Sequence, residues 1–259
     1  MTYCLGIKLK EGLVGIADTR ITSGTETTMA KKLFTYEDGK NSLFLMTSGL
    51  RSVRDKALTY FKEVLEAKEE PMDKLYKVVN LFSKQIKIVA KEDKVSLHEA
   101  GLHFNIHTLI GGQMEGDTDV KLYLIYPEGN WIEIGGATPF YIIGNSGYGK
   151  PILNRSITKE VGIPFALKTG LLSFDSTRVC ANDVGYPIDV FVYETGTFKI
   201  KQHRFYEKDL RHLSDQWAKV LNNGIAEMSE EFADVFVDKK KKKVEAKKVV
   251  AKKKVVKKK

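Results

Sequence analysis

Residues 2–20 of the chain read TYCLGIKLKEGLVGIADTR, and this stretch decides the fold class. Every second residue of segment 3–9 is apolar, which is the period of a β-strand. Segment 13–18 is a second apolar run, and the loop 10–12 between the two runs ends in glycine. A short loop with glycine between two such runs predicts a β-hairpin.

The loop length also predicts how the two strands pair. A three-residue loop at 10–12 places Cys4 opposite Asp18 and Thr2 opposite Arg20. Asp18 would then share a sheet face with Thr2, as its diagonal neighbour.

The rest of the chain alternates between strand-like and helix-like segments. Apolar residues recur at helical spacing in four segments, and short apolar runs bounded by turn residues predict further strands. The order is strands, two helices, strands, a helix, strands and a helix. It favours an α+β protein with two stacked sheets between helical layers. The predicted helices are 53–64, 75–89, 164–173 and 210–221; the predicted strands are 43–47, 105–111, 120–126, 131–134, 140–143, 188–193 and 198–203.

Length and composition predict a single domain, residues 2–237, because 259 residues with 42% apolar content can form one large core. No segment approaches the roughly 18 apolar residues of a membrane span, and no signal peptide is recognisable, so we expect a cytoplasmic protein without a membrane partner. Cys4 and Cys180 lie outside any CxxC pair, which favours reduced thiols.

The positive charge is concentrated at the C-terminus. Residues 239–259 hold 13 lysines and one glutamate, which gives +12, so the remainder of the +9 chain carries −3. Like charges with little apolar surface predict that segment 238–259 is a disordered tail. It resembles the lysine-rich tails of bacterial histone-like proteins. Two interpretations stay open, salt-sensitive binding to nucleic acid or another polyanion, and a merely solvated tail.

Thr2 follows the initiator methionine and is small enough for that methionine to be removed. A free N-terminal threonine combines a hydroxyl nucleophile with an α-amine whose ordinary pKa is about 7.7 to 8.0, so the amine can act as a base near neutral pH. One residue can therefore supply both the nucleophile and the base of an amide hydrolase.

Four motifs in order resemble the β-subunits of proteasomes: the strand beginning at Thr2, the run Gly15–Arg20, the run Lys31–Phe34 and the run Met46–Gly49. The resemblance implies the four-layer αββα sandwich of N-terminal-nucleophile hydrolases and an acyl-enzyme mechanism that needs no metal or other cofactor. Within this superfamily the chain is most similar to the bacterial Anbu branch, through the segments 2–6, 143–153 and 187–189. The similarity covers roughly residues 2–230.

The resemblance implies a role for each matched residue. Thr2 would attack with its hydroxyl, and Lys32 would favour the deprotonated form of that hydroxyl. Asp18 would hold Lys32 in place. The backbone N–H of Gly49 would donate a hydrogen bond to the oxyanion.

A further serine of the family corresponds to Asn145 or to Ser146, of which Ser146 is preferred. The family also has an aspartate and a serine three residues apart near the site, where this chain has Ala181–Gly185. Asn182 and Asp183 are the candidate substitutes there.

Three other patterns are weaker indications of a functional site. Segment 144–150 fits the phosphate-loop pattern G-x-x-x-x-G-K, but Pro151 occupies the position of the Mg²⁺-binding hydroxyl. His103 and His107 lie in an extended segment without the intervening glutamate of metalloproteases. Cys4 cannot become N-terminal by methionine removal. We therefore expect neither a nucleotide nor a metal.

The sequence thus predicts a threonine peptidase that acts on peptides or proteins and assembles into a ring or an open spiral of identical subunits. Two alternatives remain: an amidase of the same fold acting on a small amide, and a catalytically silent assembly or polyanion-binding protein that uses the tail.

Overall fold

The computed structural model describes residues 2–236. The chain divides into two compact units, one ending at Ser214 and one beginning at Asp215, and both sheets belong to the first. The expected domain boundary at residue 237 stays a prediction. The predicted tail, 238–259, lies outside the described residues.

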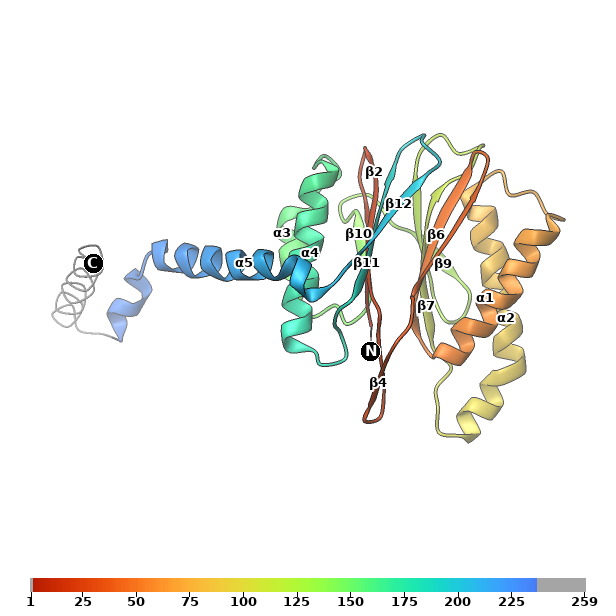
Figure 1. Ribbon diagram of the computed structural model, residues 1–259, viewed down its shortest axis with the longest axis horizontal. Coiled ribbons are helices and arrows are strands. Elements are labelled where there is room, and N and C mark those ends of the chain that lie inside the picture. The colour runs from red at the N-terminus through yellow and green to blue at the C-terminus, as the bar shows by residue number, and fades with distance from the viewer. Residues whose placement is uncertain (1, 237–259) are drawn as a thin grey trace. The chain divides into compact units, whose positions relative to one another are not determined.

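Within the described residues, the strands form two five-stranded sheets and one two-stranded hairpin. Neighbouring strands run antiparallel in every pair. The first sheet has the order β10 (Phe140–Gly144), β1 (Tyr3–Lys8), β2 (Gly12–Asp18), β11 (Ile188–Glu194), β12 (Ile200–Phe205). The second has the order β5 (Leu33–Asp38), β6 (Asn41–Gly49), β7 (Ile106–Gln113), β8 (Lys121–Ile125), β9 (Trp131–Glu133). The hairpin is β3 (Arg20–Ser23) with β4 (Glu26–Met29), which project below the first sheet in Figure 1.

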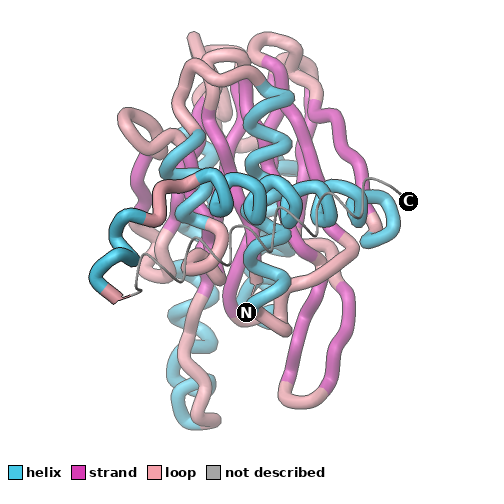
Figure 2. The backbone as a smooth tube through the Cα atoms, turned by 90° about the vertical axis from the view of Figure 1, so that its left-hand side faces the viewer, coloured by secondary structure: helices cyan, strands magenta, loops and turns pink. Residues whose placement is uncertain are grey.

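The two sheets stack on each other, and helices cover their outer faces (Figure 1). Helices α1 (Arg51–Ala67) and α2 (Leu75–Glu99) lie on the second sheet, and α3 (Lys150–Ser156) and α4 (Ile163–Cys180) lie on the first. Figure 2 views the molecule from this second helical side, with the strands behind the helices. The expected αββα sandwich is therefore confirmed. Helix α5 (Glu207–Glu227) and a short 3₁₀ helix (Glu231–Val235) follow.

Three apolar clusters fill the spaces between these four layers. The cluster between the sheets includes Phe44 and Phe191, whose ring centroids lie 4.1 Å apart. The cluster between α1, α2 and the second sheet includes Phe61 and Phe82, which meet edge to face at 5.1 Å. Tyr3 belongs to the third cluster, between the first sheet and α3 and α4. Alternate residues of β1 enter different clusters, which places the start of this strand between two cores.

The predicted pairing of the first hairpin is wrong by one residue. Cys4 pairs with Ala17 rather than with Asp18. The reason is a tighter turn, in which the N–H of Leu9 donates to the carbonyl of Gly12 at 2.8 Å. Gly12 belongs to β2, where it pairs with Glu194, and not to the loop. Because side chains alternate along a strand, this shift by one residue places Asp18 and Thr2 on opposite faces of the sheet.

No helix within residues 2–236 combines the length and the apolar character that a bilayer crossing requires. The cytoplasmic location of the protein stays a prediction.

Candidate active site

Thr2 lies at the start of β1, wedged between the two sheets. It is 7% exposed, and its carbonyl oxygen accepts a hydrogen bond of 2.7 Å from the N–H of Asn145. Gly144, at the end of β10, has a φ of +92°, and a Cβ there would lie 2.0 Å from the Thr2 carbonyl oxygen. Only glycine combines this conformation with this approach, so the end of β10 holds the backbone of Thr2 tightly.

Asp18 and Lys32 form a buried ion pair beside Thr2. Lys32 Nζ lies 2.6 Å from Asp18 Oδ1, and the two side chains are 3% and 0% exposed. Asp18 Oδ1 also accepts a hydrogen bond of 2.9 Å from the N–H of Tyr3, and Lys32 Nζ donates to the carbonyl of Arg20 at 2.6 Å. Asp18 closes β2 and Lys32 immediately precedes β5. The β3–β4 hairpin between them returns the chain so that the two side chains meet.

Burial and charge act on Asp18 in opposite directions. Burial raises the pKa of the Asp18 carboxyl, while the Lys32 ammonium and the N–H of Tyr3 lower it; burial is the larger effect. Removing one member of a buried ion pair leaves an uncompensated charge and typically costs about 3–5 kcal/mol. Separation of Asp18 and Lys32 is therefore unfavourable, and the ion pair holds Lys32 in one orientation.

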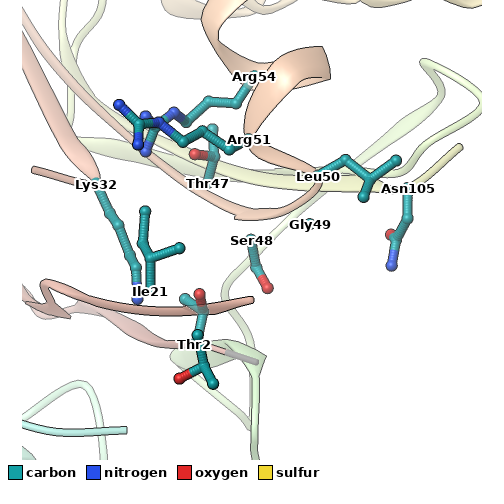
Figure 3. A pocket seen from close by; sticks show the side chains of 11 residues that line it. Thr2, Ile21, Lys32, Thr47, Ser48, Gly49, Leu50, Arg51, Arg54 and Asn105 are labelled. Atoms are coloured by element: carbon teal, nitrogen blue, oxygen red, sulfur yellow. The ribbon is translucent and has the colours of Figure 1, made fainter. Parts of the chain in front are cut away.

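Thr2, Lys32 and Gly49 open into one pocket of about 350 Å³. Figure 3 shows Lys32 reaching toward Thr2, with Ser48 and Gly49 across from them. Gly49 ends β6 with a φ of +131°, and a Cβ there would lie 2.2 Å from the carbonyl oxygen of Asn105. Eleven residues line the pocket: Thr2, Ile21, Thr22, Lys32, Thr47, Ser48, Gly49, Leu50, Arg51, Arg54 and Asn105.

Helix α1 begins at this pocket. Its N-cap residue, Leu50, makes no side-chain capping bond, and its first turn contains no acidic residue. The partial positive charge of a helix N-terminus therefore faces the pocket uncompensated by a nearby carboxylate in that turn.

Ser146 lies elsewhere. It lines a separate pocket of about 270 Å³ together with Lys150 and Tyr141, while the neighbouring Asn145 contacts Thr2 through its backbone. The role predicted for Ser146 stays a prediction.

The segment that departs from the proteasome pattern also lies near the ion pair. The carbonyl of Asn182 accepts a hydrogen bond of 2.7 Å from Arg20 Nη1, and Arg20 supplies the carbonyl that holds Lys32. Asn182 thus contacts the residue that supports Lys32. The role predicted for Asp183 stays a prediction.

Ser48, Arg51, Arg54 and Asn105 were not predicted as pocket residues. Arg51 and Arg54 come two and five residues after Gly49 and are three residues apart, which is the spacing of one helix face. That spacing could have indicated them. Asn105 carried no signal, because it reaches the pocket through the pairing of β6 with β7.

Cys4 is fully buried, and its Sγ lies 3.9 Å from the carbonyl oxygen of Thr47. Burial raises the pKa of its thiol, which keeps it protonated and unreactive. Among residues 2–236, no group of three or more His, Cys, Asp or Glu side chains is placed to hold a metal ion.

The sequence matches no model of a protein family and no curated protein. Solved structures do match. An Anbu (Gly-1) mutant from Hyphomicrobium sp. strain MC1 is 30% identical, over 89% of this chain and 99% of that one, with a TM-score of 0.82. The Anbu ancestral β-subunit from Yersinia bercovieri is 26% identical, over 88% and 97%, with a TM-score of 0.81. A structure described as the helical assembly of the Anbu complex from Pseudomonas aeruginosa is 28% identical, over 88% and 97%, with a TM-score of 0.83.

These similarities extend over nearly the full length of each solved chain, and they agree with a sandwich whose first strand begins at the pocket. The chain belongs to the Anbu family, a branch of the proteasome-like N-terminal-nucleophile hydrolases.

Proposed function

We propose that the protein is a threonine peptidase whose nucleophile is Thr2 after removal of Met1. The observation that carries this proposal is the pocket shared by Thr2, Lys32 and Gly49, with Lys32 fixed from behind by Asp18. Nucleophile, cation and a backbone donor at a strand end are the parts that amide hydrolysis by a hydroxyl requires.

The proposed reaction proceeds through an ester. Thr2 Oγ bonds to the substrate carbonyl carbon, and its proton passes to the Thr2 amine. The Lys32 ammonium favours loss of that proton, and the N–H of Gly49 donates to the oxyanion. The carbon–nitrogen bond then breaks as the leaving amine takes the proton. Water attacks the ester in the same way, releasing the acid and restoring Thr2.

Replacement of Thr2 tests this function. Thr2→Ala removes the hydroxyl but keeps the amine, so hydrolysis of fluorogenic peptides should be lost, whereas Thr2→Ser should keep part of it. Lys32→Ala should be nearly as damaging. Because these residues act as a unit, the double variant should be little worse than either single one. Mass spectrometry should show the loss of one methionine residue. Undiminished turnover by Thr2→Ala would refute the proposal; circular dichroism confirms that each variant folds.

We also propose that the chain assembles with copies of itself into a ring or open spiral. This rests on the similarity to the Pseudomonas aeruginosa protein, whose structure is described as a helical assembly. Light scattering at micromolar concentration should give a mass well above the 29.2 kDa of one chain. A monomer at all such concentrations would contradict the assembly.

A further inference from the structure

The pocket beside Thr2 carries positive charge. Among its eleven lining residues, all within the described part of the chain, Lys32, Arg51 and Arg54 are cationic and none is acidic. Arg51 and Arg54 lie in the first turns of α1, on the wall that continues from Gly49 (Figure 3).

These charges are only partly neutralised. Lys32 is balanced by Asp18. Arg51 and Arg54 share a single carboxylate, Asp55, at 3.3 Å and 2.6 Å. Two guanidinium groups against one carboxylate leave 2 − 1 = +1 at this wall.

The two guanidinium groups also keep donors for a ligand. In the described residues, Arg51 hydrogen bonds through Nε alone, and its side chain is 57% exposed. Arg54 is more enclosed, at 13% exposed, and its Nη1 makes only a long bond of 3.4 Å to the carbonyl of Lys31. An exposed guanidinium group, that of Arg51, and a more enclosed one, that of Arg54, therefore border the same pocket. Planar guanidinium groups bind carboxylates with paired, charge-assisted hydrogen bonds.

We propose that this pocket selects an acidic residue, glutamate or aspartate, at the position whose carbonyl Thr2 attacks. The inference rests on the proposed function, because the side chain of the attacked residue lies nearest to the nucleophile. A volume of about 350 Å³ admits one such side chain. Its carboxylate neutralises the excess charge at Arg51 and Arg54, whereas a lysine or arginine side chain is repelled. Arg51 and Arg54 are thus specificity-determining residues.

A peptide series tests the proposal with the full chain. Four fluorogenic peptides differ only at the residue before the cleaved bond, which is Glu, Gln, Leu or Lys. Glu and Gln have nearly the same shape, so their difference reports the charge. We expect kcat/KM for the Glu peptide to exceed that for the Gln peptide about tenfold, mainly through KM, and to fall toward it as salt rises. Equal values for Glu and Gln, or a preference for Leu, would overturn the proposal.

Three variants assign the effect to the named residues. Arg51→Gln and Arg54→Gln should each reduce, several-fold, the ratio of kcat/KM for the Glu peptide to kcat/KM for the Gln peptide. Asp55→Asn should increase the Glu preference, because it releases both guanidinium groups; a folding defect cannot produce this gain. The matched control is Arg155→Gln, on an exposed residue of α3 in the opposite helical layer, which should change nothing. An unchanged ratio in Arg51→Gln and Asp55→Asn would contradict the assignment.

A binding measurement separates this inference from the proposed function. If no peptide is hydrolysed, the peptidase proposal fails, and fluorescence anisotropy with labelled Glu and Gln peptides still tests the pocket. Tighter binding of the Glu peptide, lost in Arg51→Gln, supports it. Equal binding of the two peptides overturns it.

Discussion

Lys32 has two of its three ammonium hydrogens fixed by protein acceptors. Asp18 Oδ1 and the carbonyl oxygen of Arg20 both lie 2.6 Å from Nζ. An ammonium group has three donors, so one remains for the pocket that Lys32 lines. Held in this way, Lys32 lines the pocket without the rotational freedom of an exposed lysine; in the proposed reaction, this is how Asp18 would act without contacting the substrate.

His107 gives a prediction for pH dependence at the same scale. It pairs with Ser48 across β6 and β7, and burial lowers the pKa of its imidazole below 6.5, against a smaller opposing effect of Glu128. The folded protein therefore binds fewer protons than the unfolded chain below pH 6.5. This contribution to stability is complete above pH 6.5 and is lost as the pH falls from there through the lower pKa of the folded state.

His107→Gln should consequently make the free energy of unfolding less sensitive to acid between about pH 7 and 5. Urea unfolding at several pH values measures the slope. His212→Gln, at an exposed histidine, is the control. An unchanged slope in His107→Gln would contradict the prediction.

At the scale of elements, a chain of hydrogen bonds ties the first strand to two helices. Tyr3 Oη donates to Ser173 Oγ on α4 at 2.7 Å, and Ser173 Oγ donates to the carbonyl of Gly149, beside α3, at 2.8 Å. Tyr3 is fully buried, and burial raises the pKa of its phenol. Because Tyr3 follows Thr2 directly, these hydrogen bonds also help to position the proposed nucleophile.

Ser173→Ala should destabilise the protein by about 1–3 kcal/mol, since it leaves the buried Tyr3 hydroxyl without its partner. Adding Tyr3→Phe should recover part of that loss, as it removes the orphaned group. Ser176→Ala on the same helix, whose hydroxyl bonds only to its own helix at Leu172, is the control. Chemical denaturation measures the unchanged protein, Ser173→Ala, Tyr3→Phe, the double variant and Ser176→Ala. A double variant as unstable as the two single losses combined would rule out the coupling.

The elements themselves were largely predictable, and their pairing was not. Apolar periodicity located α1 and α2, each of which buries one face, and a helix-favouring run located α4. Periodicity also located α5, although Leu210 is the one residue of that helix that is buried. It missed the β3–β4 hairpin, where β4 is exposed throughout and no periodic pattern exists. It also missed α3, a helix of 7 residues that follows a glycine-rich loop. The register of β1 on β2 depends on which residues close the turn. Gly12 closes it with Leu9, and Gly12 also pairs with β11 on the far side of β2.

The same division holds for the site. Thr2, Asp18, Lys32 and Gly49 all occur at or beside strand ends, so the resemblance to known subunits could place them from short motifs. The spacing of Arg51 and Arg54 indicates that they share a helix face, but that this face borders the pocket depends on the orientation of α1. Ser146 was chosen from a glycine-rich segment with two equivalent positions, and only its backbone neighbour contacts Thr2.

At the scale of the whole molecule, the charge separates into −3 on residues 1–238 and +12 on residues 239–259. If the tail binds nucleic acid, deletion of residues 239–259 should abolish that binding and leave peptide hydrolysis unchanged. Neutralised phosphates release counterions, so the binding should also weaken steeply with salt. Gel-shift assays at low and high salt, with the full chain as control, measure this. Equal binding by the truncated chain would refute a role for the tail.

Gly49 and Gly144 flank Thr2 from two sheets, and in both the space for a Cβ is occupied by backbone. A single-base change that replaces glycine by another amino acid always introduces a Cβ. No single-base replacement at either position therefore gives a residue that the surrounding backbone can accommodate. Stepwise evolution can reshape the pocket through side chains such as Arg51 and Arg54, while the two glycines around Thr2 stay closed to gradual change.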